Sequence, residues 1–273
     1  MLFPQKWYFW GKGFLEKKEK KEIAFLIVGI PGEPWPSPYL TDSIEIIFLK
    51  NGKICGMGVP RDFLIKKPFL GKINALYQKE GIELLKKTLE EIFQIKIDYY
   101  LVLDLKTLKE ITDILGGVEI SVEKDLVDPR FPTKNRGYEK FVLKKGKYLM
   151  KGDLLLKYIR TRHPDSDFGR IERQQKTALA LFKKAKKLNL FSDFKKIVSL
   201  YLKLKGKTNF SLKDYFLVKK EIEKLKENKI KFFLLDEKYL LPQKMKIQGN
   251  YLWVLIPKKN FKNIKNEIEN FCN

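Results

Sequence analysis

Short apolar runs alternate with segments of helical period along the chain, and this alternation constrains the fold more than any other feature. The run IAFLIVGI at residues 23–30 predicts a buried strand. SIEIIFL and KICGMGV flank Asn51 and Gly52, a pair that favours a tight hairpin because both turn positions adopt positive φ. Residues 74–95 carry apolar side chains at helical spacing. Strands that alternate with helices predict an α/β or α+β architecture, and no Gly/Ser linker divides the chain into separate domains.

The rest of the chain continues this alternation. YYLVLDL, VEISV, KFFLL and YLWVLI predict strands, and helices are expected near 105–115, 151–157, 168–188, 191–204, 211–226 and the Lys-rich C-terminus. Gly116 and Gly117 predict the stop between a helix and the strand VEISV. Residues 124–147 are a polar excursion to which no strand is assigned.

The arginines are distributed unevenly. The chain carries 56 Lys and Arg against 33 Asp and Glu, a formal charge of +23, which favours polyanions such as nucleic acid, anionic lipid or phosphate-rich polymers. Only seven of the basic residues are Arg, and four of these are Arg160, Arg162, Arg170 and Arg173. Where Lys is the general surface cation, clustered Arg indicates bidentate recognition of phosphate or carboxylate, with a structural ion-pair network as the alternative.

Cysteine and histidine usage excludes a zinc site. Cys55 and Cys272 are far apart, no CxxC pair occurs, and His163 is the only histidine in the sequence. A disulfide between the two cysteines is possible, but two unpaired thiols are the favoured expectation, because Cys55 lies in an apolar strand-like run and Cys272 lies beside the terminus.

The first 22 residues form a basic and aromatic segment ahead of the domain at 23–273. No run approaches the ~20 apolar residues that a membrane span requires. The stretch from Trp7 to Trp10 is followed by a Lys-rich stretch, a pattern that suits a lipid interface; a frayed terminus is the alternative.

Five sequence motifs carry a family resemblance. KGDLLLKYIRTRHPDSDFGRIERQQKTALALF combines an Arg-x-Arg pair, an Asp-rich turn and an Arg-x-x-Arg-Gln-Gln helix. Upstream lie LTDSIEII, VPRDFLI, GKINALY and ILGGVEISV. Together these motifs resemble the signature of the LytR-CpsA-Psr family of cell-wall glycopolymer transferases. They lie in family order within residues 23–188, and residues 189–273 look similar to the C-terminal part of some members.

The resemblance implies a function. Family members transfer a teichoic-acid-like or capsular glycopolymer phosphate from undecaprenyl pyrophosphate to a hydroxyl of peptidoglycan, assisted by Mg²⁺, at the outer face of the cytoplasmic membrane. It also implies a single domain with a central mixed sheet flanked by helices, and an apolar channel for the polyprenyl chain between sheet and helices. The residues that match the pyrophosphate-binding positions are Arg61, Arg160, Arg162, Arg170 and Gln174, and Asp42 matches a metal-associated carboxylate.

The sequence departs from the family pattern in two places. Gly29, Ile30 and Pro31 stand where members usually have Gly-Val-Asp, so one metal-associated carboxylate is missing, and Glu33 is a weak substitute. The family's N-terminal membrane anchor is not found either, which implies a peripheral route to the lipid-linked substrate.

Two other functions remain open. The Pro31 departure allows a polyprenyl-pyrophosphate binding module with impaired catalysis. A nucleic-acid-binding transcription attenuator fits the basic composition, but the lysines are spread along the chain and no DNA-binding motif is evident. At the level of single residues, Asp42 could simply form a turn, and His163 could be a solvated loop residue. Asp165 and Asp167 suit helix capping better than catalysis.

Overall fold

A five-stranded sheet forms the centre of the molecule. The computed structural model describes residues 22–273 apart from 51, 134–136, 163–166, 190, 224–229, 259–260 and 273. The strands lie in the order β11-β3-β2-β1-β6, and their bounds are β1 Glu22–Ile30, β2 Ser43–Lys50, β3 Lys53–Gly58, β6 Tyr99–Asp104 and β11 Ile230–Leu234. Strand β2 pairs antiparallel with both β1 and β3, whereas β6 pairs parallel with β1 and β11 pairs parallel with β3. The predicted mixed sheet is therefore confirmed.

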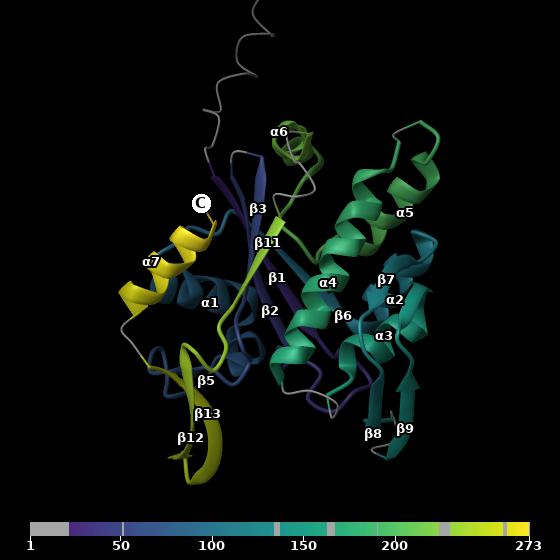
Figure 1. Cartoon of the computed structure of the whole chain (residues 1–273). Coiled ribbons are helices and arrows are strands. Elements are labelled where there is room, and N and C mark those ends of the chain that lie inside the picture. The colour runs from purple at the N-terminus through teal and green to yellow at the C-terminus, as the bar shows by residue number, and fades with distance from the viewer. Residues whose placement is uncertain are drawn as a thin grey trace, which may run out of the picture.

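Helices cover both faces of this sheet (Figure 1). On one face lie α1 (Leu76–Phe93) and α7 (Phe261–Cys272). The other face carries α2 (Leu105–Ile114), α3 (Gly152–Arg160), α4 (Asp167–Lys186) and α5 (Phe194–Leu204), and α6 (Leu212–Glu223) lies across one end. A short 3₁₀ turn, η1 (Ile73–Ala75), precedes α1. The helical segments expected from apolar periodicity are all present, with ends shifted by a few residues.

The two faces of the sheet differ in what they cover. Because side chains alternate along a strand, Ile44 and Ile46 of β2 point to the α1 face, where they share a buried core with Leu85 and Leu89. Glu45 points to the opposite face, beneath α4. The sheet therefore has one face that is filled by a solid core and one face that lines a pocket.

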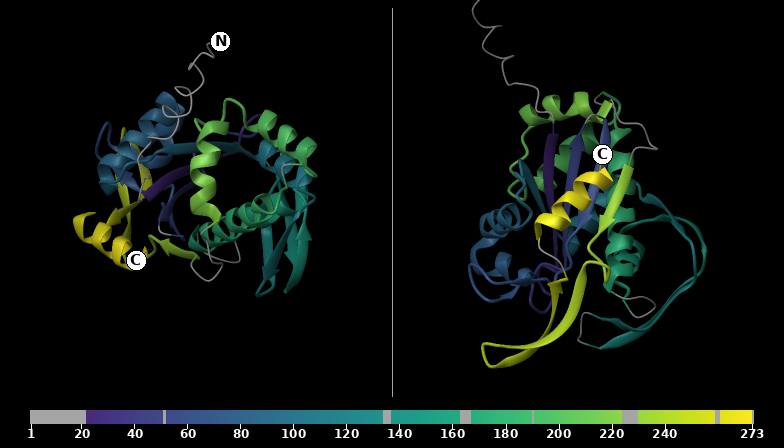
Figure 2. Two further views of the ribbon diagram at one scale, coloured as in Figure 1. Left: turned by 90° about the horizontal axis from the view of Figure 1, so that it is seen from above. Right: turned by 60° about the vertical axis from the view of Figure 1, so that its left-hand side comes forward.

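Four smaller ladders surround the sheet. They are β4 (Leu64–Ile65) with β5 (Gly71–Lys72), β7 (Val118–Val122) with β10 (Gly146–Met150), β8 (Leu126–Pro132) with β9 (Tyr138–Leu143), and β12 (Leu240–Ile247) with β13 (Asn250–Pro257). The β8–β9 and β12–β13 hairpins extend from the same end of the molecule (Figure 2). The sequence analysis assigned no strand to residues 124–147. Their period-2 pattern was missed because only inward residues such as Phe131 and Phe141 are buried, while the positions between them are mostly polar and exposed.

The expectation of two unpaired thiols is wrong. Cys55 of β3 and Cys272 of α7 form a disulfide, with their Cα atoms 5.4 Å apart. The sequence separation of 217 residues concealed this pairing, because only the packing of α7 against the sheet brings the two positions together. The bond ties the C-terminal helix to a central strand.

Candidate functional site

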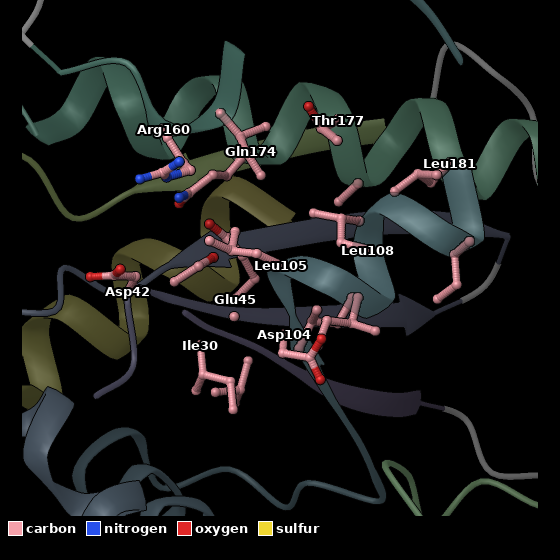
Figure 3. A pocket seen from close by; sticks show the side chains of 18 of the residues that line it. Ile30, Asp42, Glu45, Asp104, Leu105, Leu108, Arg160, Gln174, Thr177 and Leu181 are labelled. Atoms are coloured by element: carbon pink, nitrogen blue, oxygen red, sulfur yellow. The ribbon is translucent and has the colours of Figure 1, made fainter. Parts of the chain in front are cut away.

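A pocket of about 550 Å³ lies between the sheet and the helices that cover its second face. Its floor comes from β1, β2 and β6, and its walls come from α2, α4 and α5. The lining is mostly apolar, including Ile27, Leu101, Leu108, Ile111 and Leu181. Charged side chains gather at one end, around Asp42 and Arg160, and the apolar lining continues along α4 toward Leu181 (Figure 3). The pocket lies between sheet and helices, where the family resemblance implied an apolar channel; that it takes a polyprenyl chain stays a prediction.

Asp42 lies at the charged end, immediately before β2. Its backbone N–H donates to the Gly29 carbonyl at 2.8 Å, which extends the β1–β2 ladder by one residue and fixes the start of its side chain. The Arg61 Nη1 donates to Asp42 Oδ1 at 2.6 Å, and Arg162 Nη2 lies 3.6 Å from the same oxygen. Arg61 itself does not line the pocket, so it holds Asp42 from behind. Both contacts use Oδ1 of Asp42, which also lines the pocket.

Asp62 is a second carboxylate near Arg61. Its carboxylate lies 3.9 Å from Arg61 Nε, but its closer partner is Lys72, at 2.6 Å. Asp42 is therefore the nearer carboxylate for Arg61.

Arg160 is held by aromatic and backbone contacts. Its guanidinium lies 3.9 Å from the ring centroid of Trp35 and 5.1 Å from that of Phe131, and its Nη2 donates to the Pro132 carbonyl at 3.3 Å. Burial lowers the pKa of Arg160, Asp42 opposes this, and Arg162 adds to it. A cation that is partly desolvated in this way gains strongly when an anion approaches.

The geometry of the Arg160 and Arg162 pair corrects one expectation. The helix expected near 151–157 extends to Arg160, which is the last residue of α3, and Arg162 lies two residues beyond its end. Both nevertheless line the pocket. The backbone N–H of Arg162 is fixed by the fully buried Asp128, whose Oδ2 accepts it at 3.0 Å. Asp128 also accepts from the Arg130 N–H, so one carboxylate joins β8 to the segment after α3.

Arg170 and Gln174 approach from α4, as the helical spacing predicted. Both line the pocket, and the side chain of Arg170 is buried. Arg173 points elsewhere and donates to the Thr161 carbonyl, so it braces the connection between α3 and α4. Arg173 therefore has a structural contact, to a backbone carbonyl and not to the ion-pair network raised as the alternative, whereas Arg160, Arg162 and Arg170 line one cavity.

Two buried polar atoms on α4 belong to the predicted Gln174 and to Thr177, which sequence reasoning missed. Gln174 Oε1 and the hydroxyl of Thr177 are buried and have no hydrogen-bond partner among the described residues. Thr177 is one turn beyond Gln174 and lines the same pocket. No sequence signal distinguished this threonine, because its helix position looks like any core-facing residue.

Glu45 is a second missed residue. It lines the pocket from β2, is only 3% exposed, and accepts a hydrogen bond from Gln175 Nε2 at 3.1 Å. Burial raises its pKa from an ordinary 4.5 to about 8, with the Gln175 bond opposing the rise. At neutral pH the protonated form therefore predominates. A glutamate inside the apolar alternation SIEII was the available signal.

Asp104 lies near Pro31, the position at which the sequence departs from the family pattern. It is the residue of β6 that pairs with Ile30, so its backbone is adjacent to the place where the missing carboxylate would be. Its Oδ1 caps α2 by accepting from the Thr107 N–H, and its Oδ2 accepts from Lys207 Nζ at 2.6 Å. Burial opposes ionisation of Asp104, but the bonds from Lys207 and Thr107 outweigh it and lower its pKa. These partners occupy both oxygens, so Asp104 does not fit a metal ligand in this arrangement.

The fit of a metal rests on Asp42. Within the described residues there is no group of three or more His, Cys, Asp and Glu that could hold an ion. Glu33 is exposed and does not line the pocket, and His163 and Asp165 lie outside the described residues. Mg²⁺ keeps several waters and needs only one or two carboxylates when phosphate oxygens complete its shell. The donor set therefore fits Mg²⁺ only together with a phosphate ligand.

Comparison with known proteins places this chain in a family. The model of the LytR_cpsA_psr family matches residues 9–270. The chain belongs to the LytR-CpsA-Psr family. The resemblance drawn from the five motifs is confirmed.

Two relatives and one solved structure are similar to this chain. Regulatory protein MsrR of Staphylococcus aureus (strain COL) is 37% identical over 205 residues, which cover 72% of this chain and 58% of that protein. The polyisoprenyl-teichoic acid–peptidoglycan teichoic acid transferase TagT of Bacillus subtilis (strain 168) is 30% identical over 203 residues, covering 71% of this chain and 62% of TagT. A structure of TagT with bound octaprenyl pyrophosphate lipid has a TM-score of 0.67 at 23% identity and covers 93% of this chain and 91% of that one.

The sequence matches cover only part of each relative. The matched regions span 58% and 62% of the lengths of MsrR and TagT. The structural likeness to TagT shows the shared fold. Within the part of the chain that the structure describes, no helix is long and apolar enough to cross a membrane.

Proposed function

We propose that this LytR-CpsA-Psr protein is a phosphotransferase that moves a glycopolymer phosphate from a polyprenyl-pyrophosphate carrier to a hydroxyl of peptidoglycan. The observation that carries the proposal is the junction of an arginine-lined mouth and an apolar pocket in one cavity. A polyprenyl pyrophosphate has the same two-part chemistry, a doubly phosphorylated head on a long hydrocarbon chain. The octaprenyl pyrophosphate in the TagT structure and the transferase name of TagT support this assignment.

The arginines suit the chemistry of phosphoryl transfer. The acceptor hydroxyl attacks the phosphorus that carries the glycopolymer, the bond from this phosphorus to the bridging oxygen breaks, and polyprenyl monophosphate leaves and takes up the proton that the hydroxyl releases. Negative charge spreads over the phosphoryl oxygens during this step, so the protein's task is positioning and charge stabilisation. Arg160, Arg162 and Arg170 line the site of this charge, Arg61 holds Asp42, and Gln174 contributes amide hydrogen bonds.

Mg²⁺ is the proposed cofactor at Asp42. Asp42 and phosphate oxygens would hold it, and the ion supplies additional charge neutralisation when bound. The protein's own contribution is the fixed position of the carboxylate, which the Gly29 backbone bond and Arg61 determine. Pro31, where the family usually has Asp, leaves one carboxylate fewer, and we propose that this makes Mg²⁺ binding depend on substrate.

The proposed place of action is the outer face of the cytoplasmic membrane, with peripheral contact to its surface. The Cys55–Cys272 disulfide supports this location, because such bonds persist in oxidising compartments. The substrate and the acceptor would both be reached there.

Two alternatives compete with this proposal. A lipid-pyrophosphate binding module with impaired catalysis is favoured by Pro31, and a regulatory role is favoured by the name of MsrR. A nucleic-acid-binding regulator is the disfavoured alternative. Basic side chains alone are enough to bind the phosphates of a nucleic acid, so such a function does not require the apolar pocket beside the arginines.

A transfer assay tests the proposal. Full-length protein is mixed with a polyprenyl-pyrophosphate-linked glycopolymer and peptidoglycan, while Mg²⁺ is titrated. Metal-dependent release of polyprenyl monophosphate, with polymer on the peptidoglycan, is the expected result. Bound lipid without turnover would favour the binding module, and no lipid binding at all would reject the proposal.

A further inference from the structure

The helix α5 has an apolar stripe that faces outward. Phe194, Val198, Tyr201 and Leu202 fall within one arc of about 100° on the helix, because successive residues are separated by about 100°. All four are exposed, Phe194 by 60% and Leu202 by 62%, and Phe191 just before the helix is 90% exposed. Apolar side chains gathered in this way on a surface mark a contact site.

The inner side of the same helix lines the pocket. Leu200 and Leu204 point into the apolar part of the cavity, together with Phe182 and Ala185 from the end of α4. Ala185 is itself exposed, so the pocket reaches the surface beside α5. Figure 1 shows α5 beside the upper part of α4, at the opposite end of the molecule from the β8–β9 and β12–β13 hairpins.

The charge around α5 is strongly positive. Residues 183–206 contain eight lysines and a single acidic residue, Asp193. Lys184, Lys186, Lys187 and Lys195 are exposed around the end of the pocket. An apolar and aromatic stripe bordered by lysines matches the interface of an anionic bilayer, where aromatic rings lie at headgroup level and lysines contact phosphates.

We propose that the exposed face of α5, with the lysines at the end of α4, docks on an anionic lipid bilayer and places the apolar end of the pocket against it. The assignment rests on the proposed function, since a polyprenyl chain in the pocket must come from a bilayer. A second copy of this chain fits the surface poorly, because a symmetric contact would bring the two sets of lysines together.

A second exposed aromatic surface provides the matched control. Tyr251 and Trp253 of β13 are 67% and 62% exposed and pair across the hairpin with Lys246 and Lys244. They also combine aromatic and basic side chains, but neither lines the pocket. Docking through α5 predicts that this hairpin stays in water.

Vesicle binding by the full chain tests the surface. Sedimentation with vesicles of phosphatidylglycerol and phosphatidylcholine, and with phosphatidylcholine alone, is compared for wild type, Phe194→Ser/Val198→Ser/Leu202→Ser and Tyr251→Ser/Trp253→Ser. The α5 variant is expected to lose at least about tenfold in partitioning to anionic vesicles, whereas the hairpin variant matches wild type. Changing Lys184 and Lys187 to Gln should cost about fivefold for each lysine near the surface.

Three further measurements separate the possible results. Amide exchange should show new protection in residues 191–204 on vesicle addition and none in β13; unchanged exchange in α5, or loss of binding only in the hairpin variant, overturns the assignment. Light scattering that finds a dimer in wild type and a monomer in the α5 variant also overturns it, in favour of a second copy. Binding of soluble farnesyl pyrophosphate is measured separately. If wild type does not bind it, the proposed function is rejected, and the vesicle experiment still shows whether α5 contacts a bilayer.

Discussion

At one end of the pocket Arg160 and Arg162 surround Asp42, whereas the other end is lined by Phe182 of α4 and by Leu200 and Leu204 of α5, a helix whose outer face is also apolar. The charged end is fixed by polar bonds of defined geometry, such as Asp128 to the Arg162 N–H and Asp42 to Arg61. The apolar end has no residue of α5 that is fully buried. A pyrophosphate group is recognised through hydrogen bonds of fixed direction, whereas an isoprenoid chain requires only a continuous apolar surface that excludes water. The two ends of the pocket differ in the same way.

Glu45 lies between these two regions, and its ionisation gives the largest expected effect. Its folded pKa of about 8 lies above the ordinary 4.5, so as pH rises the unfolded chain releases the proton first. Stability is therefore expected to fall from about pH 4.5 and to level off above about pH 8, by up to roughly 5 kcal/mol. Glu45→Gln should remove this fall.

Thermal and urea unfolding between pH 5 and 9 measures the effect. Glu123→Gln is the control, because Glu123 is fully solvated and its pKa is lowered by Lys176. An alkaline stability loss that persists in Glu45→Gln would assign the loss to another group.

Replacing Arg162 by Lys tests the directional end of the pocket. The charge is kept but the planar fork is lost, so binding of polyprenyl pyrophosphate should weaken by roughly tenfold to a hundredfold, which corresponds to about 1.5 to 3 kcal/mol for a charge-assisted bond. Calorimetric titration measures the affinity. Arg130→Lys is the control, since Arg130 contacts Asp128 through its backbone N–H and does not line the pocket. Equal losses in both variants would remove the special role of Arg162.

Replacing Asp42 by Ala tests the proposed metal site separately from the pocket arginines. The Mg²⁺ concentration needed for half-maximal transfer should rise by about tenfold, because one carboxylate ligand is lost. Lipid binding in the absence of Mg²⁺ should change less than it does in Arg162→Lys. Asp62→Ala serves as the comparison, because Asp62 pairs with Lys72 and lies outside the pocket lining. An unchanged Mg²⁺ requirement in Asp42→Ala would exclude this carboxylate as a ligand.

The smallest effect is expected at Thr177. Its hydroxyl is buried without a partner among the described residues, so Thr177→Val should leave stability unchanged or raise it by about 1 kcal/mol. Binding of a prenyl chain should be retained or tightened. Thr112→Val is the matched control, because the Thr112 hydroxyl donates to the Leu108 carbonyl at 2.7 Å and its loss should be destabilising. If Thr177→Val instead weakens lipid binding, the hydroxyl contacts the ligand head.

Local patterns predicted much of the fold. Gly116 and Gly117 have positive φ at the predicted helix stop, and Gly52 has positive φ in the predicted hairpin turn. β8, β9 and β12 were missed, because these strands bury few residues and their outward positions are polar. The unpaired-thiol expectation failed for a related reason, since no local pattern reports that α7 packs near Cys55.

The sequence by itself determined the family, the helices, the five strands of the central sheet, and five residues of the pocket lining, Asp42, Arg160, Arg162, Arg170 and Gln174, because motif spacing and side-chain periodicity are properties of neighbouring residues. Only the tertiary structure decided what depends on burial and on contacts between distant segments. It separated Arg173 as a brace from Arg160, Arg162 and Arg170 in the pocket, and it placed Glu45 where burial raises its pKa. It also left the apolar stripe of α5 facing outward, because a helix sequence specifies which residues share a face but not what that face meets.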